Sequence, residues 1–308
     1  MPLPTNQKLV SLSEDIVDQL NAIFGSHPGF RAAHARGAML TGTFTPTPDA
    51  AALSTAPHFN QAFTPITARF SSSTGIPTIP DTDPNANPRG LAIRFNLGDH
   101  VHTDIIAHSA PAFPVRTGEE FLDFFRAIAG GTVSDFLASH PAAQAFVQTP
   151  KPFPASLARE GYFALHAFKF TDAEGVTRYG RYTIIPDEGL EHLDETTVKS
   201  KSETYLFDEL PQHLALGPIV FHVLCQIAND GDVTDDVTIH WPKDRKTVNL
   251  GKVTLDRLVP ENAREQKTII FDPIPRVNGI EASDDPLFEV RAAVYLIGGR
   301  RRRAAPDS

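Results

Sequence analysis

The chain has 308 residues and a formal net charge of −9, with 41% hydrophobic and 21% charged residues, as is typical of a soluble globular protein of one large or two ordinary domains. The acidic balance disfavours nucleic acid as a partner, and the single cysteine, Cys225, excludes a disulfide framework within the chain. No signal peptide opens the sequence and no apolar run reaches the ~18 residues of a membrane span, so we expect a cytoplasmic protein without membrane contact.

The first element is an amphipathic helix over residues 11–24. Its apolar side chains follow helical spacing, Ser13 is the expected N-cap, and Gly25 is the expected stop.

The following chain is rich in short segments of β-branched and aromatic residues, separated by Pro, Gly, Asn and Asp. They predict eight strands, over 36–44, 66–71, 89–95, 101–107, 163–170, 178–186, 218–228 and 250–258. A helical block over about 117–158 interrupts them, and a last helix is expected over 284–298, ending at Gly298-Gly299. The Pro-rich stretch 76–88 is interpreted as a loop, so residues 1–308 are expected to form a single α+β domain, a closed eight-stranded antiparallel β-barrel with surrounding helices.

One group of residues could hold a metal ion. His100 and His102 are two apart, as in strands that present both side chains on one face, with Asp104 and His108 following. Such pairs ligate zinc or iron in some barrels. The alternative, which the twelve histidines of the chain favour, is a polar strand face without a metal.

A second group lies near the C-terminus. Arg291 and Tyr295 are four apart and share a helix face, where a guanidinium favours the phenolate that a ferric haem requires of a tyrosine ligand. The alternative is surface packing of the two side chains. The run Arg300–Arg303 is, by itself, typical of a solvated basic tail.

Several segments, taken in order, resemble those of haem catalases over about residues 25–302. They are Arg31–Gly37, Ala68–Ser72, Asn87–Phe95, Val237–Pro242, Leu250–Leu255, Phe271–Pro273, Gly279–Glu281 and Asp284–Pro286, followed by Arg291 and Tyr295. The chain is most similar to the short, catalase-related haem peroxidases (mini-catalases), because it stops soon after Tyr295. The resemblance thus implies a catalase-like core that binds haem b.

The resemblance also implies a role for each site residue. His34 would be the distal acid–base, with Ser71 fixing its tautomer, and Tyr295 would ligate the iron as a phenolate stabilised by Arg291. Pairing with the haem propionates is implied for Arg31, Arg69 and Arg302, and lining of the haem pocket for Phe113 and Phe121. His108 falls where catalases carry a distal asparagine; an imidazole can still donate to peroxide, but we expect only weak oxidation of a second peroxide.

The function implied is a haem peroxidase that reduces hydrogen peroxide or organic hydroperoxides with a small organic electron donor. Two alternatives stay open: an isomerase that rearranges hydroperoxides without net redox change, and a non-enzymatic haem-binding protein. The arm that interlocks subunits in larger catalases is missing, so we expect a homodimer.

Overall fold

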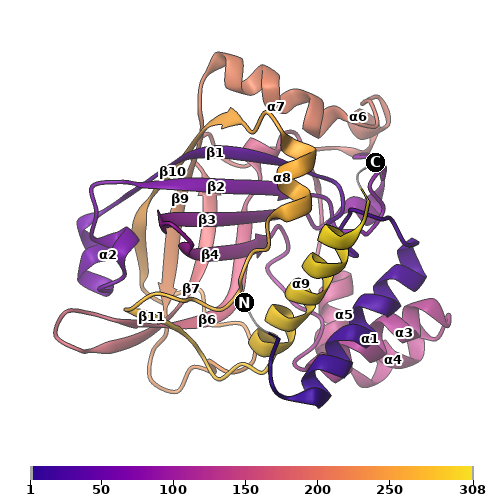
Figure 1. The fold of residues 1–308 in the computed structure, drawn as a ribbon, viewed down its shortest axis with the longest axis horizontal. Coiled ribbons are helices and arrows are strands. Elements are labelled where there is room, and N and C mark those ends of the chain that lie inside the picture. The colour runs from indigo at the N-terminus through magenta and orange to yellow at the C-terminus, as the bar shows by residue number, and fades with distance from the viewer. Residues whose placement is uncertain (1–2, 307–308) are drawn as a thin grey trace.

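Eight antiparallel strands close into a barrel in the computed structural model, which describes residues 3–306. The ring runs β6-β4-β3-β2-β1-β10-β9-β7 and returns to β6, while β11 extends the sheet beyond β6 (Figure 1). The ring strands are β1 (Gly37–Pro46), β2 (Thr64–Ser71), β3 (Gly90–Gly98), β4 (Val101–His108), β6 (Tyr162–Thr171), β7 (Thr177–Pro186), β9 (Ile219–Ile227) and β10 (Thr247–Leu258). Each corresponds to a predicted strand, so the predicted α+β barrel is confirmed; the outermost residues of the predicted domain, 1–2 and 307–308, lie outside the described range.

The barrel interior is a packed core of aromatic and aliphatic side chains. Phe44, Phe70, Phe95 and Phe221 are wholly buried there, because alternate residues of each strand point inward. The ring is weakest between β4 and β6, which pair only through His108 and Phe163, whereas the other neighbouring strands pair over many residues. The barrel is therefore filled, and a ligand must bind outside it.

Helices cover one side of the barrel, where α1, α3 and α9 pack together (Figure 1). The helices are α1 (Gln7–Phe24), α2 (Pro48–Leu53), α3 (Gly118–Ala129), α4 (Val133–Ser139), α5 (Pro141–Gln148), α6 (Glu195–Lys199), α7 (Tyr205–Leu216), α8 (Asn262–Thr268) and α9 (Leu287–Ala304). Three short strands complete the elements: β5 (Phe153–Pro154), β8 (His192–Leu193) and β11 (Ile280–Ala282). Among the described residues, none of the helices combines the length and the apolar run needed to cross a bilayer.

Two predicted helix boundaries are wrong. The first helix begins at Gln7 because Asn6, whose side chain accepts from Lys8 N and Leu9 N, is the N-cap; Ser13 is buried inside the helix instead. The last helix continues through Gly298-Gly299 to Ala304. Gly299 packs closely there, since a Cβ at this position would lie 2.3 Å from Ile270 Cδ1 and would displace that side chain.

Candidate active site

A cavity of about 250 Å³ lies between the barrel and helices α1, α3 and α9. All the site residues predicted from the sequence line it: Arg31, His34, Arg69, Ser71, His108, Phe113, Phe121, Arg291, Tyr295 and Arg302. They come from the loop before β1, from β2, from the end of β4, from the α3 region and from α9. Residues more than 250 positions apart in the chain thus share one cavity.

His34 and Ser71 form a hydrogen-bonded pair in this cavity, with 3.0 Å between His34 Nδ1 and Ser71 Oγ. The backbone of His34 is left-handed (φ 57°), which is uncommon for a non-glycine residue, and its N–H donates to Ser73 O at 3.0 Å. Gly90 makes room for the pair, since a Cβ there would lie 2.5 Å from Ser71 Oγ and 3.0 Å from His34 Nδ1. The ring of His34 is therefore fixed by its backbone conformation and by its hydrogen bond to Ser71, and Gly90 leaves room for both side chains.

The electrostatic surroundings keep His34 neutral. Burial, and then the positive charges of Arg69 and Arg31, lower the pKa of His34 to about 4. A neutral imidazole with one nitrogen bonded to a hydroxyl offers its other nitrogen as a proton acceptor. At neutral pH this residue can take a proton from a ligand in the cavity.

Tyr295 and Arg291 occupy successive turns of α9. Arg291 Nη2 donates to the phenol oxygen of Tyr295 at 3.0 Å, as the spacing of four residues predicts. A guanidinium that donates to a phenol oxygen stabilises negative charge on that oxygen. Tyr295 therefore has the partner that an anionic iron ligand needs.

His166 and Asp285 are buried beside this pair and were not predicted from the sequence. His166 Nδ1 lies 2.9 Å from Asp285 Oδ2, and burial, together with the charge of Arg291, lowers the pKa of His166 to about 4. The ring packs against Phe288 in a tilted arrangement, with 4.5 Å between centroids, and the register of β6 with β7 shifts between Ala164 and Phe168 at this point. A bulge in β6 thus places His166 next to the start of α9. Strand periodicity alone does not predict such a bulge, so this residue was missed from the sequence.

Three guanidinium groups crowd together at one end of the cavity without a carboxylate. Within residues 3–306, Arg31, Arg69 and Arg302 make hydrogen bonds only to Gln266 and to backbone carbonyls, such as Ile269 O, which accepts from Arg302 Nη2 at 2.6 Å. Burial and the neighbouring positive charges lower the pKa of Arg31 well below its usual value, and burial, then Arg302, lowers that of Arg69 to about 9. Buried charges without counterions are costly, so this end of the cavity favours an anionic ligand. A haem group, which carries two propionates, fits that requirement.

His108 also lines the cavity, and its hydrogen bond to the backbone defines its tautomer. Its Nδ1 accepts from Ala110 N at 3.3 Å, so the proton of the neutral ring is on Nε2, where it can be donated. Burial, followed by the charges of His34 and Arg291, lowers the pKa of His108 to about 3. The ring lies 6.2 Å from that of Phe113, which is stacked in turn on Phe121.

The predicted alternative of a metal held by His100, His102 and His108 is not supported by the arrangement. His100 is in the turn between β3 and β4 with φ 59°, and His102 bonds Asp104 at 3.1 Å, while His108 lines the cavity described above. In the described part of the chain, no three His, Cys, Asp or Glu residues are grouped as metal ligands. The polar strand face is the interpretation that holds for His102.

Comparison with known proteins gives a consistent result. The Catalase family model matches residues 26–306. The chain is 34% identical over 290 residues to a catalase-related peroxidase of Mycolicibacterium paratuberculosis (92% of each chain), and 30% identical over 301 residues to one of Synechococcus elongatus (94% of this chain, 88% of the relative).

Solved structures support the fold. Catalase A from Saccharomyces cerevisiae matches with a TM-score of 0.77 at 22% identity, and a bacterial catalase with 0.78 at 23%. Each match covers 98% of this chain but only 65% and 62% of the longer catalase chains. The family model and the two peroxidases show that the chain belongs to the catalase family.

Proposed function

We propose that this protein is a haem-dependent peroxidase that reduces hydrogen peroxide or organic hydroperoxides with electrons from a small organic donor. The observation that carries the proposal is that a neutral imidazole, His34, and a guanidinium-bound phenol, Tyr295, line one cavity. Arg31, Arg69 and Arg302, which have no carboxylate partner among residues 3–306, suit the two propionates of haem b. Two catalase-related peroxidases align over most of the chain, which supports the same activity.

Haem would supply the two electrons that cleave the peroxide O–O bond and take them back from the donor. In the tautomer that leaves His34 Nε2 free, Nδ1–H donates to Ser71 Oγ. Nε2 would accept a proton from the peroxide and return it to the departing oxygen, which would leave as water or an alcohol. Tyr295 would hold the iron through its phenolate oxygen, whose negative charge Arg291 would stabilise.

His108 would donate from Nε2 to bound peroxide where other catalases use an asparagine. Since its pKa is lowered to about 3, it is neutral at neutral pH and keeps that donor. An imidazole is bulkier than a carboxamide, so a second hydrogen peroxide should be oxidised poorly and an organic donor favoured. A cytoplasmic location and a homodimer remain predictions of the sequence.

The experiment is a pair of single substitutions with matched controls. We expect Tyr295→Phe to weaken haem retention and shift the Soret band, and His34→Ala to slow the reaction with hydrogen peroxide by about 10²–10⁴-fold. Tyr179→Phe and His240→Ala, which lie outside the cavity, should leave both properties unchanged. Full peroxide-dependent activity in both cavity variants would refute the proposal.

The same preparations separate the alternatives. Conversion of a lipid hydroperoxide without any reductant would favour the isomerase. A protein that binds haem stoichiometrically but shows no reaction with any peroxide would favour haem binding alone. The His34–Ser71 pair argues against the latter, because binding by itself needs no ordered proton acceptor.

A further inference from the structure

Arg89 is a wholly buried arginine that does not line the cavity. It lies directly before β3 and belongs to the segment Asn87–Phe95 that resembles haem catalases, yet the proposed reaction does not use it. The next residue is Gly90, whose missing Cβ leaves room for the His34–Ser71 pair. A buried guanidinium is costly unless its partners compensate for the lost water. The partners of Arg89 therefore indicate what it does in the fold.

The guanidinium of Arg89 joins two segments of the chain. Nη1 donates to Ser72 Oγ at 2.9 Å, and Nη2 donates to Asp81 O at 2.7 Å. Asp81 also provides the counter-charge, since its Oδ1 lies 3.4 Å from Nη1. Ser72 and Asp81 are themselves wholly buried, so water does not compete for these hydrogen bonds. Arg89 thus ties the residue that follows β2 to the Pro-rich loop.

Ser72 lies between the two residues that fix His34. The residue before it, Ser71, bonds His34 Nδ1 through its hydroxyl at 3.0 Å. The residue after it, Ser73, accepts from His34 N at 3.0 Å through its carbonyl. The first bond sets the tautomer of the imidazole, and the second holds the left-handed backbone of His34 (φ 57°). A displacement of Ser72 would therefore move both supports of the ring together.

The surroundings of Arg89 are held independently of its guanidinium. Arg89 N donates to Ser109 Oγ at 2.9 Å, and Ser109 N donates to Arg89 O at 2.8 Å. Asp81 accepts from Leu206 N at 3.0 Å and pairs with Arg36 at 3.5 Å. Loss of the guanidinium alone should thus leave β3 and Asp81 in place and release the side chain of Ser72.

We propose that Arg89 is a positioning residue for His34: its guanidinium holds Ser72, and through Ser72 it keeps the imidazole in the orientation and tautomer that accept a proton from peroxide. The inference rests on the peroxidase function proposed above. Because Arg89 does not line the cavity, it acts on the reaction with peroxide only through its neighbours.

The test compares two arginines that both pair with Asp81. Arg89→Met removes the bond to Ser72, whereas Arg36→Met removes a cation beside Asp81 that donates to Ile79 O instead. In the holoprotein we expect Arg89→Met to slow the reaction with hydrogen peroxide by about ten- to a hundredfold, because a misplacement of about 1 Å can cost about 10²-fold. Arg36→Met leaves the reacting groups in place and should slow it less than about twofold.

A second variant breaks the same link without removing a charge. Ser72→Ala deletes the acceptor of Arg89 Nη1 and keeps the proposal testable if Arg89→Met does not fold. We expect a reaction about two- to 13-fold slower, as for the loss of one hydrogen bond. Arg89→Lys, whose ammonium can still donate to Ser72 Oγ, should recover part of the rate that Arg89→Met loses.

Hydrogen exchange of the holoprotein, followed by mass spectrometry, gives a readout without turnover. The amide of His34, which donates to Ser73 O, should exchange at least about tenfold faster in Arg89→Met than in Arg36→Met. A purely structural role of Arg89 would instead speed exchange throughout the barrel. Faster exchange throughout the barrel, unchanged exchange at His34, or equal rates with peroxide in the two variants would each overturn the proposal. If the unsubstituted protein reacts with no peroxide, the peroxidase function fails, while the exchange still decides whether Arg89 positions His34.

Discussion

Ser71→Ala isolates what the hydroxyl contributes to the acid–base residue. Ser71 is buried and bonds His34 Nδ1 at 3.0 Å, while the backbone of His34 is fixed independently by its bond to Ser73 O. The substitution should therefore leave the imidazole in place but free its tautomer and rotation. One net hydrogen bond is worth about 0.5–1.5 kcal/mol, which corresponds to about a two- to 13-fold slower reaction with peroxide.

Removing the imidazole itself should have a much larger effect. His34→Ala deletes the proton acceptor, for which about 10²–10⁴-fold is expected. The rate constant is measured by stopped-flow absorbance at the Soret band after mixing with hydrogen peroxide, without a donor. Ser139→Ala, on the exposed end of α4, is the control. The reasoning is wrong if Ser71→Ala is as slow as His34→Ala, or if it is as fast as the control while its Soret band is unchanged.

Three further predictions concern stability, the guanidinium cluster and the thiol. His58 is 1% exposed, and burial lowers its pKa to about 3. As the pH falls, the unfolded chain binds a proton at this histidine near pH 6.5, before the folded chain does, so the free energy of unfolding decreases between about pH 6.5 and 3. His58→Leu should therefore reduce the loss of unfolding free energy between pH 7.5 and 4.5 by about 2–3 kcal/mol, as measured by urea titration. Arg302→Met removes one of three crowded cations, so it should raise the Tm of the haem-free protein yet weaken haem binding by about tenfold or more in a transfer assay; a lowered Tm would contradict the crowding argument. Burial raises the pKa of the Cys225 thiol far above its usual value, so Ellman's reagent should react about a hundredfold more slowly with native than with denatured protein, and rapid reaction of the native protein would contradict this.

The barrel strands could be predicted because the residues that favour each strand lie within that strand. Strands such as Tyr179–Ile185 carry the β-branched and aromatic residues that a half-buried sheet requires, and turn residues mark their ends. Helix ends were less predictable. Asn6 caps α1 through its side chain, and Gly299 lies inside α9 next to Ile270, which is distant in sequence. No local pattern reports that contact.

The residues of the candidate active site likewise include some that the sequence predicts and some that it does not. Residues that belong to recognisable segments, such as His34 and Tyr295, could be assigned from the order of those segments. Gln266 and His166 could not be, because their importance comes from tertiary neighbours: Gln266 accepts from Arg69 at 2.8 Å across 197 positions, and His166 meets Asp285 across 119. One histidine among twelve is not distinguished by its sequence surroundings.

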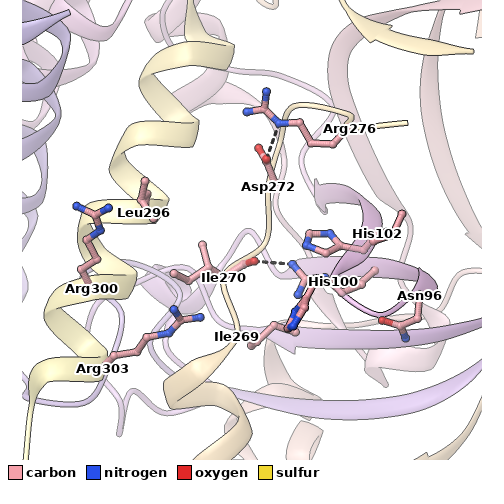
Figure 2. Close-up of a pocket in the computed structure, with 13 residues that line it drawn as sticks. Asn96, His100, His102, Ile269, Ile270, Asp272, Arg276, Leu296, Arg300 and Arg303 are labelled. Atoms are coloured by element: carbon pink, nitrogen blue, oxygen red, sulfur yellow. Dashed lines mark hydrogen bonds and ion pairs between the residues drawn. The ribbon is translucent and has the colours of Figure 1, made fainter. Parts of the chain in front are cut away.

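The run Arg300–Arg303 shows how continuation of a helix can turn a basic segment into several different sites. Because successive residues of a helix are rotated by about 100°, the four guanidinium groups cannot share one direction. Arg302 points inward and is 4% exposed among the cavity arginines, and Arg301 pairs with Asp18 on α1. Arg300 and Arg303 line a hollow on the outer surface (Figure 2), where Arg303 donates to Thr268 O. A helix that ended at Gly298-Gly299 would leave all four as a solvated tail. Extension of α9 to Ala304 therefore brings Arg302 into the cavity, at the end that favours an anionic ligand.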